Sequence, residues 1–238
     1  MEWLAELASV EGDMSSRVAE PVPGARALFV FHLALLSWWL FVLICYYVVL
    51  RFVKVDPAFP LGVVSLGMIV TALIVFTRFA RGRRGTASET AARVAAALAI
   101  VDVIGESLQF APRLGLPIVI PGDGSTAELV VRLVWASCEY SMRVAMFLAL
   151  WRAQPELDKR LVRLFFALIG VNYLATWIAF TRAAGPLREF WSDVRLATLI
   201  GKLNMPMGLL WLSIIVYLSW RLARGSSANA SAVTARAV

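Results

Sequence analysis

The chain has 238 residues, of which 60% are hydrophobic and only 16% are charged. An ordinary soluble domain has about 45–50% apolar and about 25% charged residues, so this composition excludes that class and indicates a membrane protein. The formal net charge is +7, and the single histidine, His32, excludes haem and metal centres that need several imidazoles. We therefore predict no cofactor and no metal site.

The first residues are acidic, with Glu2 and Glu6 among them, whereas a signal peptide begins with basic residues. We therefore expect residues 1–25 to form a cytoplasmic or interfacial segment. Residues 26–222 are expected to form the transmembrane bundle, and residues 223–238 a disordered cytoplasmic tail.

Six apolar stretches follow, each long enough for a helix that crosses a bilayer core of about 30 Å. They cover residues 27–50, 61–79, 91–110, 130–151, 164–181 and 196–220. The sequence thus predicts an all-α, polytopic membrane helix bundle of about six transmembrane helices. The third and fourth stretches are less apolar than the others, so we expect them to lie inside the bundle.

Three local features add to this prediction. The alanine-rich run 91–99 is typical of helices that pack closely in a membrane. His32 is expected to be an interfacial polar residue near the inner end of the first span. Pro206 is expected to bend the last span, because proline cannot donate a helical hydrogen bond.

The basic residues predict an orientation. With six spans, most lysines and arginines fall in segments on the same side of the membrane as the N-terminus. Cytoplasmic segments of membrane proteins carry such an excess. Both termini are therefore predicted to be cytoplasmic, in a multi-pass protein of the plasma (inner) membrane. This placement accounts for the net charge, so nucleic acid is not expected as a partner. Arg81, Arg83 and Arg84 are expected to bind the anionic head groups of membrane lipids.

Charged residues inside the predicted spans follow helical spacing. In the third span Asp102 and Glu106 share one face. In the fourth, one face carries Glu128, Arg132, Trp135, Glu139 and Arg143. Acid and base alternate along it, and Glu139 and Arg143 lie deep in the span. Lys202 is the corresponding base of the last span.

A lone charge at mid-bilayer costs at least about 2.5–3.5 kcal/mol. We therefore predict that the third, fourth and sixth spans face one another and share a buried charge network of Asp102, Glu106, Glu139, Arg143 and Lys202. Glu106 would pair with Lys202, and Arg143 would neutralise Glu139 or Asp102. The acids outnumber the bases by one, so one acid would hold a proton or a cation.

Such a network suits several functions. The charges could hold the helices in register, form an ion or proton pathway, or line a pocket for a polar ligand. The leading hypothesis is transport or conduction of a small polar solute or ion, possibly linked to protons. The second is a non-catalytic membrane subunit or sensor, whose charges dock a partner subunit, a second copy of the chain, or a ligand. A membrane enzyme ranks third, because no catalytic motif stands out.

Overall fold

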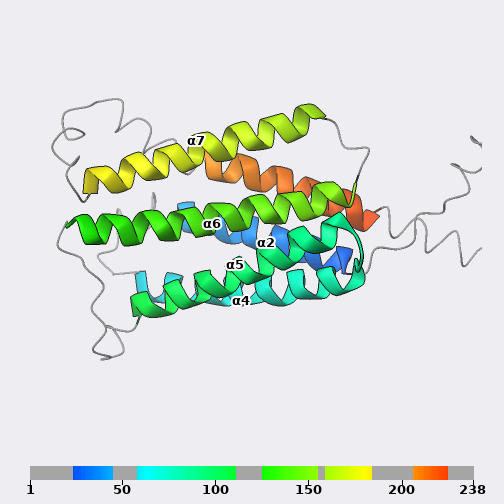
Figure 1. Ribbon diagram of the computed structural model, residues 1–238, viewed down its shortest axis with the longest axis horizontal. Coiled ribbons are helices and arrows are strands. Elements are labelled where there is room, and N and C mark those ends of the chain that lie inside the picture. The colour runs from blue at the N-terminus through cyan, green and yellow to red at the C-terminus, as the bar shows by residue number, and fades with distance from the viewer. Residues whose placement is uncertain (1–23, 45–57, 111–124, 155–158, 184–205, 225–238) are drawn as a thin grey trace, which may run out of the picture.

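The computed structural model describes residues 24–44, 58–110, 125–154, 159–183 and 206–224. These ranges contain helices and no strand: α2 (Ala25–Ile44), α4 (Ala58–Gly82), α5 (Ala87–Phe110), α6 (Thr126–Arg152), α7 (Lys159–Ala183) and a last helix, Pro206–Arg224. The helices lie side by side and alternate in direction (Figure 1). As a result, α2 begins and the last helix ends at the same end of the bundle.

Five of the described helices are long and apolar enough to cross a membrane, namely α2, α4, α6, α7 and the last helix. The chain is therefore an integral, multi-pass membrane protein, and the predicted helical membrane bundle is confirmed. The remaining helix, α5, has 24 residues and hence a length of about 36 Å. It carries Arg93, Asp102 and Glu106, and it packs between α4 and α6.

The observed helices differ from the predicted spans mainly at their ends. α7 begins at Lys159, before the predicted start at residue 164, because a charged helical turn can extend beyond the hydrocarbon core, where hydropathy gives no signal. Residues 45–50 of the first predicted span and 196–205 of the last lie outside the described residues. The bend expected at Pro206 would lie at the junction with residues 196–205, so it stays a prediction.

A seam of small residues joins α5 to its neighbours. Its alanines at positions 91, 92, 95, 96 and 99 are all buried, which confirms the close packing predicted for this run. At the start of the helix, the hydroxyl of Ser88 donates a hydrogen bond of 2.7 Å to the carbonyl oxygen of Ala149 in α6. Small side chains let two helix backbones approach closely in a membrane, where dispersion contacts and hydrogen bonds hold helices together.

His32 shows where the sequence prediction was wrong. Its side chain is fully buried rather than interfacial. The imidazole ring lies 5.2 Å from the ring of Phe31 and 5.9 Å from that of Phe76 in α4, measured between centroids. His32 therefore contributes to the packing of α2 on α4.

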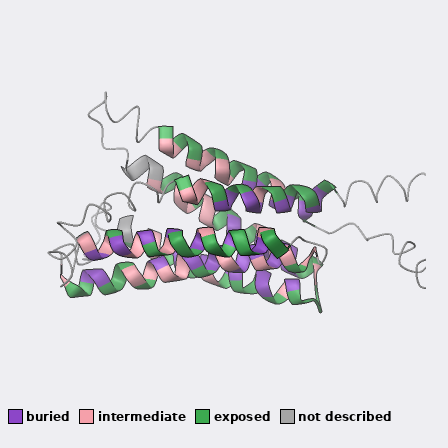
Figure 2. Cartoon of the chain, turned by 90° about the horizontal axis from the view of Figure 1, so that it is seen from above, coloured by how far each residue is buried: buried purple, intermediate pink, exposed green. Residues whose placement is uncertain are grey.

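The outer faces of the helices are apolar. Large aliphatic side chains such as Val30, Val134 and Leu210 are more than half exposed in the isolated chain. In Figure 2 exposed residues, drawn in green, occur along the length of the bundle. Exposed aliphatic surface of this extent is expected where lipid is the solvent.

One end of the bundle collects most of the basic residues in the described part of the chain. This end holds the start of α2, the turn between α4 and α5, the end of α6, the start of α7 and the end of the last helix (Figure 1). Its basic residues are Arg26, Arg81, Arg83, Arg84, Arg152, Lys159, Arg160, Arg163, Arg221 and Arg224. We call it the basic end. The positive-inside rule predicts that it faces the cytoplasm.

Candidate functional site

Four of the five predicted network residues lie in the described part of the chain. Asp102 and Glu106 are on α5, and Glu139 and Arg143 are on α6. Lys202 and its predicted pairing with Glu106 lie outside the described residues. The geometry below therefore concerns the first four residues and the side chains around them.

Arg143 is the centre of the described network. The residue is only 9% exposed, and its guanidinium is ion-paired with Glu139, one turn earlier on α6. The guanidinium carbon also lies 4.5 Å from the ring centroid of Tyr140 and 5.0 Å from that of Trp211 in the last helix. A desolvated cation over an aromatic face gains about 2 kcal/mol. These contacts allow a full positive charge to stay inside the bundle.

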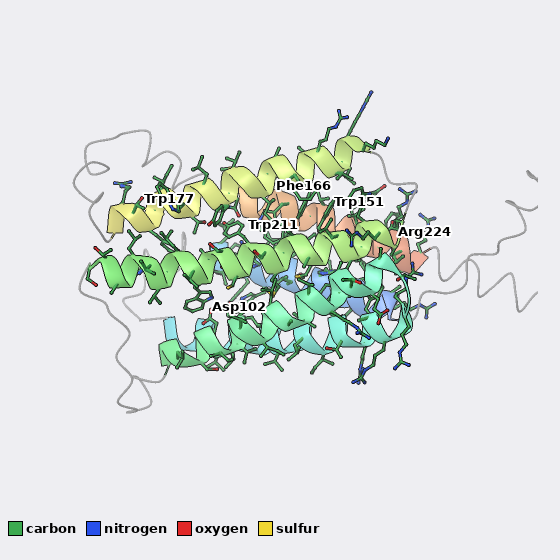
Figure 3. The ribbon with its side chains drawn as sticks, viewed as in Figure 1. Asp102, Trp151, Phe166, Trp177, Trp211 and Arg224 are labelled. Carbon is green, nitrogen blue, oxygen red and sulfur yellow. The ribbon has the colours of Figure 1, made fainter. Side chains whose placement is uncertain are left out.

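Asp102 faces α6 from the other side of the network. It is 4% exposed, and one carboxylate oxygen accepts a hydrogen bond of 2.7 Å from the indole nitrogen of Trp135 (Figure 3). The indole lies against Gly105, where an added Cβ would come within 3.3 Å of the ring. Gly105 thus leaves room for the ring beside Asp102.

The charges around Asp102 are unequal. Asp102 joins the group through Trp135, which lies one turn before Glu139 on α6, and Glu106 follows Asp102 by one turn of α5. We define the Arg143 cluster as Asp102, Glu139 and Arg143 with the aromatic side chains of Trp135, Tyr140 and Trp211. The cluster has two carboxylates and one guanidinium, so its formal charge is negative, and Glu106 adds a further acid beside it.

A layer of uncharged hydrogen bonds links α6, α7 and the last helix. The Tyr140 hydroxyl donates to the side-chain oxygen of Asn172 over 2.8 Å, and it also shares a hydrogen bond of 2.8 Å with Thr176. Trp211 donates its indole N–H to the same Asn172 oxygen over 3.2 Å. Tyr140 and Trp211, the two aromatic residues that contact the Arg143 guanidinium, are therefore fixed in place by one amide.

The contribution of α7 was missed by sequence reasoning. Asn172 is buried, and Asn172 and Thr176 are four residues apart, so they share one helical face. That spacing was the available signal, but the predicted network contained charged residues only. Within the described residues, the last helix enters the network through Trp211.

The predicted alternation of acids and bases along α6 gives two ion pairs within that helix. Glu139 pairs with Arg143, and Glu128 pairs with Arg132 nearer the start of α6. The hydroxyl oxygen of Ser125 accepts a hydrogen bond from the backbone N–H of Glu128 and caps the helix. The Arg132 guanidinium lies over the ring of Phe180 in α7, 5.8 Å from its centroid.

An open groove of about 490 Å³ lies next to the cluster, between α5, α6 and α7. Aliphatic side chains such as Leu98 and Ile169 form most of its wall, and Tyr140 also lines it. The hydroxyls of Ser137 and Tyr173 in this wall bond each other over 2.8 Å. Tyr140 lines the groove and also contacts Arg143. Only this side chain would therefore separate a molecule in the groove from the Arg143 guanidinium.

Comparison of the chain with protein-family models, with curated proteins and with solved structures gives no match.

Proposed function

We propose that this integral membrane protein transports or conducts a small polar solute or ion, with the Arg143 cluster as its binding point. The observation that carries the proposal is the buried carboxylate of Asp102, held by Trp135 in a cluster with more acid than base. A proton or a small cation would balance the excess negative charge. We place this activity in the plasma (inner) membrane.

Each charged residue would have a separate role in transport. Asp102 is the inner site for the proton or cation, because it is the more deeply buried carboxylate. Glu139, with 34% of its side chain exposed, is the exchange site nearer the protein surface. The positive charge of Arg143 lowers the affinity of both sites for a cation, so that a bound cation can be released. Glu106 is a further site for the proton or cation, one turn along α5 from Asp102.

Flux measurements test the proposal. The purified protein is reconstituted in liposomes, and a potassium diffusion potential is imposed as the driving force. A pH-sensitive dye inside the liposomes reports proton flux, and ion-selective dyes report the flux of alkali cations and small anions. We expect flux above that of protein-free liposomes, and we expect Asp102→Asn to reduce it at least tenfold, because the amide cannot carry the charge. The matched control is Glu128→Gln, which removes a buried carboxylate of α6 outside the cluster and is expected to leave the flux unchanged.

Two outcomes would contradict the proposal. One is the absence of flux for protons, alkali cations and small anions in vesicles that contain folded protein. The other is full flux through Asp102→Asn. Circular dichroism of each variant shows whether it is folded.

The groove between α5, α6 and α7 favours a second candidate function, a non-catalytic membrane subunit or sensor. In that role a partner helix or a ligand would occupy the groove and act on the buried charges through Tyr140. Gly170 borders the groove and has open space around it. Mass spectrometry of the purified protein would then find a stoichiometric partner or ligand, Gly170→Trp would remove it, and no flux would be seen.

A further inference from the structure

A second groove, of about 370 Å³, lies between α4 and α5 at the basic end, away from the Arg143 cluster. Guanidinium groups line the part nearest the turn between the helices, and apolar side chains line the rest. The main lining residues are Arg81, Arg84, Arg93, Leu73, Ala97 and Ile100.

The polar part of the groove carries uncompensated positive charge. Arg81 and Arg84 are exposed, and neither forms an ion pair within the described part of the chain. Arg93 is paired with Glu89 over 2.5 Å, yet 69% of its side chain is exposed. Three guanidiniums therefore share one carboxylate. Arginine suits a phosphate group in particular, because its planar fork can donate two parallel hydrogen bonds to two oxygens.

The turn between α4 and α5 fixes where these arginines lie. Gly85 has a φ of +77°, which glycine adopts without strain. Its N–H donates to the Glu89 carboxylate over 2.6 Å, and the Thr86 hydroxyl oxygen accepts from the Glu89 N–H over 3.3 Å. This is the pattern of a capped helix start. The turn thus holds Arg84 beside the groove before any ligand arrives.

The groove changes from charged to apolar along its length. At a rise of 1.5 Å per residue, Ile100 lies about 10 Å along α5 from Arg93, and Leu73 lies about 12 Å along α4 from Arg81. Both displacements point from the basic end into the membrane, because α4 ends and α5 begins there. Ile100 is 48% exposed in the isolated chain. The groove therefore offers cations at the head-group level and aliphatic surface below them.

We propose that this groove binds one anionic phospholipid, with its phosphate on Arg81, Arg84 and Arg93 and an acyl chain along α4 and α5. The charge complementarity selects an anionic head group, and the apolar continuation selects a lipid over free phosphate. Arg83, which was expected to act with Arg81 and Arg84, does not line the groove. The site is independent of the proposed transport function.

The test uses the full chain in detergent, titrated with phosphatidylglycerol, phosphatidylcholine or inorganic phosphate, with native mass spectrometry as the readout. We expect a one-to-one adduct with phosphatidylglycerol and at least tenfold weaker binding of phosphatidylcholine. The variant Arg81→Gln/Arg84→Gln should weaken phosphatidylglycerol binding at least tenfold. The control Lys159→Gln/Arg163→Gln removes the same charge from exposed positions at the same end and should bind as the wild type.

A second variant distinguishes lipid binding in the groove from attraction of lipid to a basic surface. Ala97 is an exposed groove residue of α5, so Ala97→Trp fills the apolar part and leaves every arginine in place. We expect it to weaken phosphatidylglycerol binding as well. Equal loss in the lysine–arginine control, or unchanged binding in Ala97→Trp, would overturn the proposal in favour of diffuse surface attraction. Inorganic phosphate that displaces the lipid at millimolar concentration would overturn it in favour of an anion site.

Discussion

The hydrogen bond from Trp135 to Asp102 gives a prediction whose magnitude can be worked out. Trp135→Phe removes the donor and also part of the ring, so the single variant mixes two effects. In an Asp102→Asn background the acceptor is neutral, while the loss of the ring is the same. A hydrogen bond to a charged group contributes about 1.5–3 kcal/mol, and one between neutral groups about 0.5–1.5 kcal/mol. We therefore expect Trp135→Phe to cost about 1–1.5 kcal/mol less when residue 102 is asparagine.

The assay is a double-mutant cycle on the free energy of unfolding. The wild type, both single variants and the double variant are unfolded with sodium dodecyl sulfate in mixed micelles, and helix content is followed by circular dichroism. The ring-truncation cost cancels in the cycle, so the coupling reports how much stronger the hydrogen bond from Trp135 is when its acceptor is charged. A coupling below about 0.3 kcal/mol would refute the reasoning, because the carboxylate of Asp102 would then not depend on this donor.

The same unfolding assay checks three further predictions. Gly170→Ala should stabilise the protein by up to about 1 kcal/mol, because alanine favours helix and its Cβ meets open space. Gly105→Ala should stabilise it less, because the added Cβ presses on the neighbouring indole ring. Equal stabilisation by the two variants would contradict this contact. Ser88→Ala should cost about 0.6 kcal/mol through its lost interhelical hydrogen bond, whereas Ser213→Ala, which loses only a bond within an exposed helix face, should be neutral. Arg143→Gln should cost about 3–5 kcal/mol, because it leaves buried carboxylates without a counter-charge; a cost below about 1 kcal/mol would show that the guanidinium is not a structural centre.

The fold was largely predictable because lipid restricts what a chain can do. In hydrocarbon every backbone group must find an internal partner, so long apolar stretches can only be helices, and counting them gives the architecture. The ends were less predictable, as at α7, which extends to Lys159 beyond the apolar stretch. The environment of His32 could not be predicted, because the apolar rings that cover it come partly from another helix.

The candidate site was predictable only in outline. Helical spacing identifies which charges share a face, and the pairing of Glu139 with Arg143 follows from a separation of four residues. The partners of Asp102 and Arg143 on other helices depend on how the helices are rotated and packed, which one sequence does not specify. The hydrogen bond from Trp135 to Asp102 and the contacts of Trp211 and Asn172 therefore became known only with the three-dimensional arrangement.

The alanine seam of α5 has a consequence for how the protein tolerates mutation. Ala92, Ala95 and Ala99 have no chemistry of their own, yet their single methyl groups determine how near α5 lies to the neighbouring helices. A larger side chain at any of them would act as a wedge and carry Asp102 away from its indole donor on α6. In a comprehensive mutational survey, these inert positions should therefore be about as intolerant of substitution as the charged residues whose spacing they set.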